Sequence, residues 1–325
     1  MRRRHFMRLL TGAAATLLPL PLRAQRATKI PRLGVLLYDT LQSDPSAAAF
    51  HRGMRDLGYV DGQNIAYEYR FAEGRLERLS SLAAELVALK PDVILALGGD
   101  VAPDAIKATK TIPIAFAVST DPVRAGLVAS MARPGGNATG VTFLQDELAA
   151  KRLGLLKEAA PQISRVAFLF NPDHVDNELR EAERGTAALG VKLHLAEVRG
   201  SADLNAAFDT AARAGVDALY VVASRQVGAN VARIVDFAAK NRLPLAGGWG
   251  AWAQAGGLIS YGPNIGEMVR QSAGFVDKIL KGEKPAEIPV QQPTHFELMI
   301  NLKTAKALDL AIPESFLLRA DKVIE

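Results

Sequence analysis

The chain has 325 residues, of which 49% are hydrophobic and 22% are charged, and it contains no cysteine. This composition is typical of a globular protein long enough for two domains, and it excludes disordered, collagen-like and disulfide-framed proteins. A formal charge of +5 on the folded body would favour nucleic acid or a membrane surface as a partner. The first 24 residues, however, hold five arginines and no acidic residue, so the remaining chain is neutral.

The N-terminal segment has the parts of an export signal. A basic start precedes an apolar run over residues 9–22, and small residues near Ala24 suit a signal peptidase. The run is too short and too interrupted by proline to span a bilayer. Arg3 and Arg4 begin a stretch similar to the twin-arginine motif, and an ordinary basic start is the alternative. Residues 1–24 therefore predict a cleaved signal and a soluble periplasmic protein, since no cysteine is present for a lipid anchor.

Beyond residue 30 the sequence alternates predicted strands with predicted helices. Residues 32–38 form a continuous apolar run, typical of a strand that helices cover on both faces. Asp44 can cap a helix whose apolar face includes Phe50 and Met54. The alternation continues with a strand at 65–69, a helix around 79–86, and strands at 91–98 and 112–118.

The second half of the chain repeats this order of elements. A helix that ends at Gly190 and another with Leu204 and Phe208 on one face alternate with strands. Strands that alternate with helices predict parallel sheets, so the expected fold class is α/β with two Rossmann-like lobes. The corresponding strands are 165–170 with 32–38, 191–198 with 65–69, 216–222 with 91–98, and 243–246 with 112–118.

Three segments outside the repeats are predicted to connect the lobes. In the second of them we expect Ser260 and Tyr261 to be hinge residues, with Tyr261 either touching a ligand or packed as an ordinary strand residue. The three segments are residues 135–143, 256–263 and 292–301. The lobes are then expected to comprise residues 31–140 with 262–290, and residues 141–261 with 291–325.

A cleft between the lobes is the expected binding site, because open α/β sheets bind ligands at the carboxyl ends of their strands. The segment from Asn171 to Asn177 opens a helix whose free N–H groups can hold a carboxylate, with helix capping as the alternative. Trp249 follows another strand and suits either an apolar contact with a ligand or a place in the core. The residues expected to bind a ligand are Tyr38, Asp39, Gly98, Gly99, Ser119, Thr120, Asp121, Asn171, Asn177, Ser224, Trp249 and Tyr261.

Signatures of catalysis are missing from the sequence. It contains no Gly-x-Ser-x-Gly elbow, no His-Glu-x-x-His, and no phosphate-binding loop that ends in Gly-Lys-Ser or Gly-Lys-Thr. The glycine cluster at 247–252 lacks the spacing of a dinucleotide-binding loop. We therefore expect a binding protein with no catalytic residue, no metal and no cofactor. The alternative is an α/β enzyme, which would need an acid–base set made by Asp39, Asp100, Asp121 and Asp173.

Several stretches resemble the family of ABC-transporter substrate-binding proteins that includes the binding proteins for tryptophan and other aromatic amino acids. The resemblance covers essentially the whole chain after the predicted signal. Its stretches are residues 140–142, 151–157, 166–172, 255–263, 276–282 and 293–308.

The resemblance implies a type I periplasmic binding protein, in which two lobes joined by a three-strand hinge close on a small solute and deliver it to an ABC permease with its ATPase subunit. It also implies an amino acid or other small carboxylate as solute and a monomeric protein that contacts neither nucleic acid nor the membrane interior. A module that reports to a membrane sensor is the alternative. The implied contacts to the solute's amino and carboxylate groups are Ser119, Thr120 and Asp121 from one lobe and Asn171 and Asn177 from the other.

Overall fold

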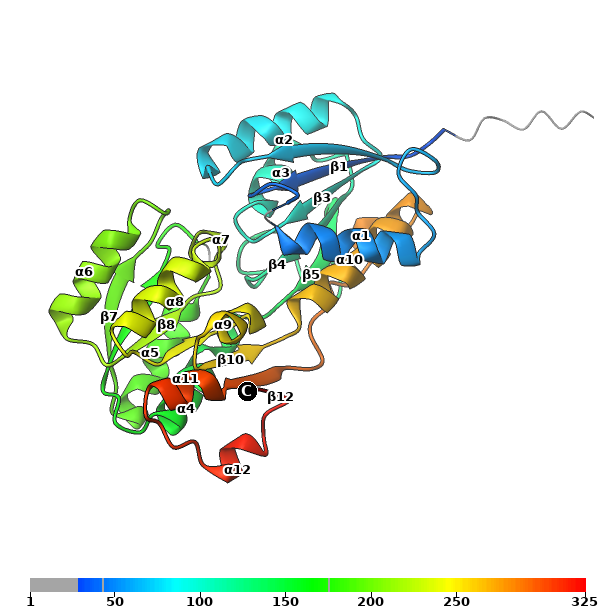
Figure 1. Ribbon diagram of the computed structural model, residues 1–325. Helices are drawn as coiled ribbons and strands as arrows, with labels where there is room; N and C mark the ends of the chain where they lie inside the picture. Colours follow the sequence, from blue (N-terminus) through cyan, green and yellow to red (C-terminus); the bar gives the residue numbers. More distant parts are fainter. Residues whose placement is uncertain (1–28, 43, 175) are drawn as a thin grey trace, which may run out of the picture.

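The computed structural model describes residues 29–325 except Ser43 and Val175, so the predicted export signal lies outside the described residues. Two α/β bodies are joined by three passages of the chain (Figure 1). The predicted fold class, with two lobes built on mainly parallel sheets, is confirmed. Within the described part of the chain, no helix is long and apolar enough to cross a membrane.

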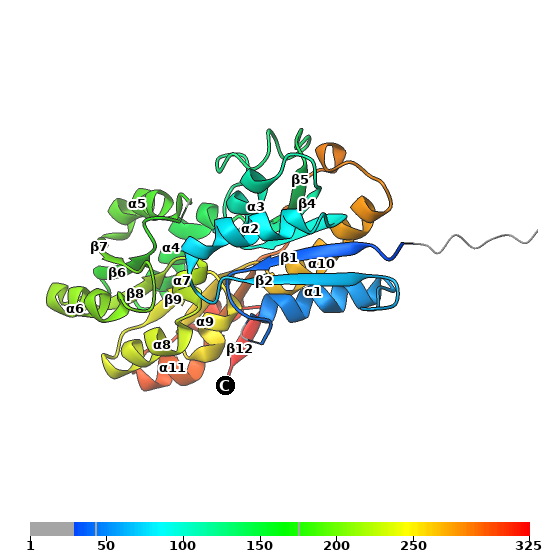
Figure 2. The same ribbon diagram turned by 90° about the horizontal axis from the view of Figure 1, so that it is seen from above.

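The first sheet has five parallel strands in the order β2-β1-β3-β4-β5. Helices α1 (Pro45–Asp56) and α10 (Ile265–Leu280) cover one face, and α2 (Leu79–Ala88) and α3 (Ala102–Ala108) cover the other (Figures 1 and 2). The strands are β1 (Arg32–Leu37), β2 (Ala66–Phe71), β3 (Val93–Leu97), β4 (Ile114–Val118) and β5 (Ala138–Thr142).

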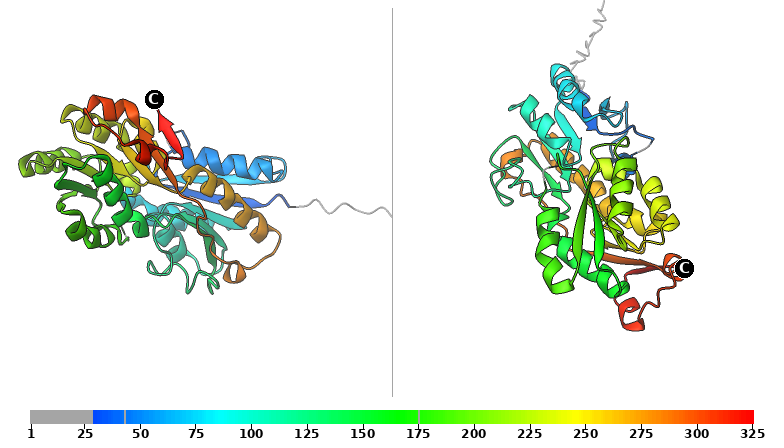
Figure 3. Two further views of the ribbon diagram at one scale, coloured as in Figure 1. Left: turned by 90° about the horizontal axis from the view of Figure 1, so that it is seen from below. Right: turned by 90° about the vertical axis from the view of Figure 1, so that its left-hand side faces the viewer.

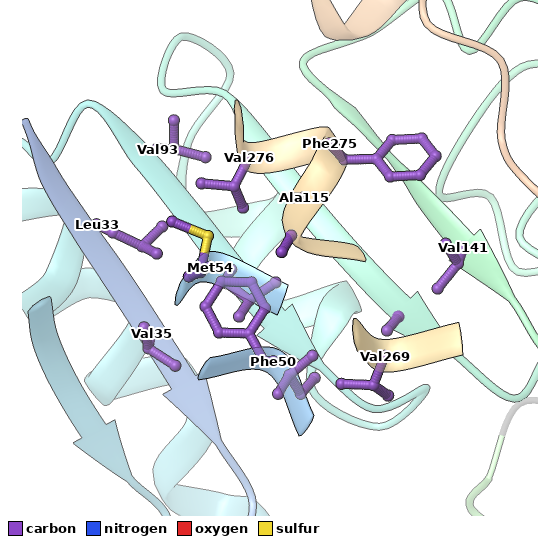
Figure 4. Packing of buried hydrophobic residues seen from close by; sticks show 14 of the residues in the cluster. Leu33, Val35, Phe50, Met54, Val93, Ala115, Val141, Val269, Phe275 and Val276 are labelled. Carbon is purple, nitrogen blue, oxygen red and sulfur yellow. The ribbon is translucent and has the colours of Figure 1, made fainter. Parts of the chain in front are cut away.

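The core under α1 draws on residues more than 200 positions apart in the sequence. Phe50 and Met54 of α1 lie between strand β1 and Val269 of α10 (Figure 4). All three side chains are buried, and burying a side chain of this size contributes about 1.5–3 kcal/mol. This packing fixes α10 to the first body although the strand before it belongs to the second.

The second sheet has the order β12-β11-β10-β9-β8-β6-β7, and only the β10–β11 pair is antiparallel. Its part β7-β6-β8-β9-β10 repeats the order of the first sheet, which confirms the predicted duplication. The strands are β6 (Arg165–Phe170), β7 (Lys192–Glu197), β8 (Ala218–Val221), β9 (Leu245–Gly247), β10 (Ile259–Gly262), β11 (Glu297–Asn301) and β12 (Lys322–Ile324).

Helices flank the second sheet on both sides. In the right-hand view of Figure 3, the green helices α4 and α5 lie on one side of the strands and the yellow helices α8 and α9 on the other. The helices of this body are α4 (Ala149–Ala159), α5 (Glu178–Leu189), α6 (Leu204–Ala214), α7 (Arg225–Gly228), α8 (Val231–Lys240), α9 (Gly250–Ala255), α11 (Leu302–Ala307) and α12 (Glu314–Leu317). The 3₁₀ turns are η1 (Leu76–Arg78), η2 (Asp146–Leu148) and η3 (Pro285–Glu287).

The connections between the bodies differ in detail from the sequence prediction. Strands β10 and β11 do not themselves cross, because both are paired within the second sheet. The chain crosses after β5, after β10 at Pro263, and before β11. We propose the predicted lobe limits with two boundaries moved. The first moves from residue 140 to Thr142, since β5 pairs with β4 along its whole length, and the second moves from residue 261 to Gly262, which pairs with Glu297 in the second sheet.

Candidate functional site

A cavity of about 380 Å³ lies where loops from both sheets meet. Its volume falls at the small end of the range for ligand sites, which is about 300–1,000 Å³. The first body contributes Asp39, Asp44, Ser46, Gly98, Gly99, Ser119, Ile265 and Gly266, and the second contributes Arg225, Gly228, Ala229, Val231, Trp249, Gly250, Ala251, Gln254, Gly262, Glu297 and Met299, while Phe143, Pro263 and Asn264 come from the crossings.

Arg225 joins the two bodies at the cavity. Its Nη1 donates hydrogen bonds to both carboxylate oxygens of Asp44, at 3.1 and 3.0 Å, and its Nη2 donates to Ser46 Oγ at 3.3 Å. Asp44 is also the N-cap of α1 and accepts from the Ser46 backbone N–H at 2.8 Å. Gly98 has φ +126°, and a side chain there would meet Arg225, so glycine lets the arginine reach across.

Asp39 is a half-buried carboxylate beside this pair. Burial raises its pKa above the ordinary value, the charge of Asp44 adds to that shift, and Arg225 opposes it. The Asp39 carboxylate is thus poorly compensated by the residues around it. A ligand cation would supply the missing compensation.

His174 makes a second connection between the bodies. Its Nδ1 lies 2.5 Å from Asp100 Oδ1 in the loop after β3, and its Nε2 lies 3.3 Å from Ser119 Oγ after β4. Burial alone would lower the pKa of this imidazole, but the charge and hydrogen bond of Asp100, with the charges of Asp176 and Glu178, outweigh burial and raise the pKa to about 9. His174 is therefore cationic at neutral pH.

Part of the cavity lining is apolar. Trp249 precedes α9 and lies against Gly228, and Met299 and Val231 continue the same surface. The indole N–H of Trp249 is buried and has no partner among the described residues. The cavity thus combines charged groups with an aromatic ring and aliphatic groups.

Five of the twelve predicted binding residues line this cavity. They are Asp39, Gly98, Gly99, Ser119 and Trp249.

Six further predicted residues do not line the cavity; five of them form local hydrogen bonds, and the hydroxyl of the buried Thr120 has no hydrogen-bond partner among the described residues. The Tyr38 hydroxyl donates to Gly74 O, Ser224 caps α7 by accepting from Val227 N, and Asp121 accepts from the N–H groups of Val123 and Arg124. Thr120 is buried behind Ser119, Asn171 accepts from Asp173 N, and Asn177 donates to Glu181.

Tyr261 lies outside the cavity lining. In the antiparallel register Gly262 faces Glu297 and Ser260 faces Met299, whereas Tyr261 is opposite Leu298. Because Glu297 and Met299 line the cavity and side chains alternate across a sheet, Tyr261 points to the other face. Its ring packs there on the core beside α4.

The sequence reasoning did not select several residues that the structure brings to the cavity. Asp44 was interpreted only as a helix cap. Arg225 directly follows Ser224 after β8; the sequence places this loop at the cleft, but only Ser224 of the two is among the predicted binding residues. Glu297 and Asn264 gave no such signal; the side chain of Asn264 donates to Glu297 at 3.1 Å.

The four aspartates of the enzyme alternative do not form one cluster. Asp39 lies in the cavity and Asp100 binds His174. Asp121 caps its own loop, and Asp173 pairs with Arg199 at the surface. An acid–base set would need at least two of these groups within reach of one substrate atom.

Arg152 connects the crossings beneath the cavity. The fully buried guanidinium donates to Tyr261 O at 2.8 Å and to the backbone and side-chain oxygens of Gln145 at 2.9 and 2.7 Å. It also pairs with Glu178, and Tyr220 completes the group with hydrogen bonds to both. One side chain therefore holds residues adjoining the first and second crossings together.

Comparisons with known proteins agree with this architecture. A family model described as ABC transporter substrate binding protein matches residues 42–324. A tyrosine-binding protein of Clostridioides difficile (strain R20291) is 28% identical over 270 residues, which cover 82% of this chain and 77% of that protein.

Two solved structures are similar over almost their whole length. The crystal structure of a conserved domain protein from Vibrio cholerae O1 biovar El Tor has a TM-score of 0.84 at 28% identity, and the match covers 91% of this chain and 100% of that chain. The crystal structure of an ABC domain in complex with L-Trp from Streptococcus pneumonia has a TM-score of 0.82 at 25% identity, and the match covers 90% of this chain and 99% of that chain.

Proposed function

The chain belongs to the family of ABC transporter substrate binding proteins, and we propose that it captures an amino acid with a large apolar side chain for an ABC importer. The observation that carries this proposal is the cavity between the bodies, whose lining includes both charged groups and Trp249. A free amino acid has the matching character, with two charges at one end and a side chain at the other.

The proposed charge contacts follow from the donors and acceptors that line the cavity. Asp39 and Glu297 are acceptors for the solute's ammonium group. Ser119 and Ser46 offer hydroxyl donors for its carboxylate, and Arg225 adds positive charge nearby. The aromatic or aliphatic side chain then lies against Trp249 and Met299.

Names of the relatives support an aromatic solute. One relative is called a tyrosine-binding protein, and one similar structure contains L-Trp. The volume of about 380 Å³ suits one small molecule of this size.

In the proposed mechanism the solute binds to one lobe and the second lobe closes over it. The closed arrangement gains the contacts of Arg225 with Asp44 and of His174 with Asp100, which join the bodies. A solute favours this arrangement only to the extent that it binds the closed form better than the open one. We further propose that residues 1–24 are cleaved, that the protein acts in the periplasm as a monomer, and that its partners are a permease and an ATPase subunit.

A thermal-shift screen of the protein without its first 24 residues tests the proposal. A ligand that binds only the native state raises the melting temperature. We expect the largest increases with L-tryptophan, L-tyrosine and L-phenylalanine, with dissociation constants then measured by calorimetry. A response to sugars but to no amino acid would contradict the proposal.

A further inference from the structure

The ring of Trp249 occupies space that is free only because residue 228 is glycine. A methyl group built on Gly228 would lie 2.8 Å from Cη2 and 3.2 Å from Cε3 of Trp249, and closer still to Cζ3. These three carbons belong to the outer six-membered ring of the indole. Protein interiors do not accommodate such an overlap, so a side chain at position 228 would displace the ring.

The backbone at Gly228 does not itself require glycine. The residue lies in α7 and its φ is not positive, in contrast to Gly98 at +126°. Alanine can adopt this conformation and is a better helix former than glycine. The effect of a substitution would therefore act through Trp249.

The core blocks one direction in which a displaced ring could move, and the cavity offers free space in another. The inner side of Trp249 packs on the core formed with α8 and Trp252, which is fully buried. Gly228 and Trp249 both line the cavity, which is the unfilled space next to the ring. A side chain at position 228 would thus push the indole into the cavity.

We propose that Gly228 is a positioning residue that determines how large a solute side chain the cavity can hold. Because Gly228 has no side chain, the ring of Trp249 can lie against α7 and leaves the cavity space unfilled. The choice of solute rests on the proposed function, whereas the position of the ring does not. With glycine at 228, a planar side chain has room to lie against the indole. With a larger residue, the same space is partly filled by Trp249.

Fluorescence tests the position of the ring without any ligand. Trp249 and Trp252 are the only tryptophans, and Trp252 is fully buried, so acrylamide quenching reports mainly on Trp249. We expect Gly228→Ala to increase quenching. The matched control is Gly274→Ala, a helical glycine of α10 outside the cavity lining, where a methyl group would meet nothing within 4 Å. Quenching unchanged in Gly228→Ala would overturn the inference.

Calorimetry with solutes of different size tests the consequence. In Gly228→Ala we expect the affinity for L-tryptophan and L-tyrosine to fall about tenfold or more, while the affinity for L-valine stays the same or rises. Gly274→Ala should leave the ratio of the affinities unchanged. A parallel loss for all three amino acids would show a general structural defect and overturn the inference.

A second substitution separates positioning by Gly228 from other effects. Phenylalanine lacks the outer ring that meets the methyl group, so adding Gly228→Ala to Trp249→Phe should change the affinity for L-tyrosine less than twofold. An equally large loss in both backgrounds would overturn the inference. If the unsubstituted protein binds no amino acid, the proposed function fails together with the solute preference, and the quenching comparison still decides the position of the ring.

Discussion

His174 and Asp100 share a hydrogen bond of 2.5 Å although 74 residues separate them, and they belong to loops of different bodies. Ser119 lies on the other side of the imidazole, 3.3 Å away. The contact exists only when the loops after β3 and β6 meet. It therefore depends on closure of the two lobes.

This dependence predicts that solute affinity falls at alkaline pH. The pKa of His174 is raised to about 9 in the structure, against 6.5 ordinarily, so its contribution to closure is complete below about 6.5 and is lost as pH rises through about 9. Loss of the His174 charge should raise the dissociation constant above about pH 6.5, by up to about tenfold per pH unit.

The variant His174→Gln isolates the imidazole in that experiment. Burial raises the pKa of the neighbouring Asp176 to about 7, so Asp176 titrates in part of the same range. We expect the glutamine variant to lose the dependence centred near pH 9, whereas Asp176, whose pKa the His174 charge lowers, still titrates in the variant. A profile identical to that of the unsubstituted protein would count against a role of His174 in closure.

Loss of the Arg225 charge should open the unliganded protein. Asp44 has a fully buried carboxylate in the closed arrangement, and an unpaired buried charge costs about 3–5 kcal/mol. Opening would return the Asp44 carboxylate to water, so Arg225→Met should increase the radius of gyration measured by X-ray scattering without ligand. The exposed Arg233, which binds Ser201 and Asn205 of its own body, gives the control Arg233→Met. An unchanged scattering curve for Arg225→Met would refute the prediction.

The buried group around Arg152 should act mainly on stability. Arg152→Met leaves Glu178 charged and unpaired, and we expect the free energy of unfolding to fall by about 3–5 kcal/mol in urea denaturation. Adding Glu178→Gln should recover part of the loss, because the buried negative charge is removed. A double variant less stable than the single one would contradict this account.

Asp39 and Tyr261 should differ sharply in their effect on binding. Asp39→Asn removes the charge proposed to bind the solute's ammonium group, and we expect the affinity to fall about tenfold or more. Tyr261→Phe removes the hydroxyl of a ring that lies on the opposite face of β10. The affinity of this variant should stay within about twofold of the original affinity. Calorimetry with the solute identified in the screen compares the two. A larger loss of affinity in Tyr261→Phe than in Asp39→Asn would contradict the placement of Asp39 at the solute and of Tyr261 away from it.

Local patterns in the sequence were enough to predict the two lobes. Continuous apolar runs such as residues 32–38 predict strands covered on both faces, and their repetition at 165–170 predicts a second copy. The ends of those strands also pointed to Asp39, Gly98 and Ser119, because a parallel sheet presents its carboxyl ends at one edge. These predictions need only the spacing of apolar residues along the chain.

The tertiary structure alone decided which side chains face the cavity and which hold the lobes together. The pairing register of β10 with β11 and the pleat of the strands place Glu297 at the cavity and Tyr261 against the core. A shift of the register by one residue would move each side chain to the other face of the sheet. Arg225 meets Asp44 across 181 residues, and nothing in the local sequence around either one specifies the other. Such contacts depend on how two separately folded bodies meet, which local periodicity does not encode.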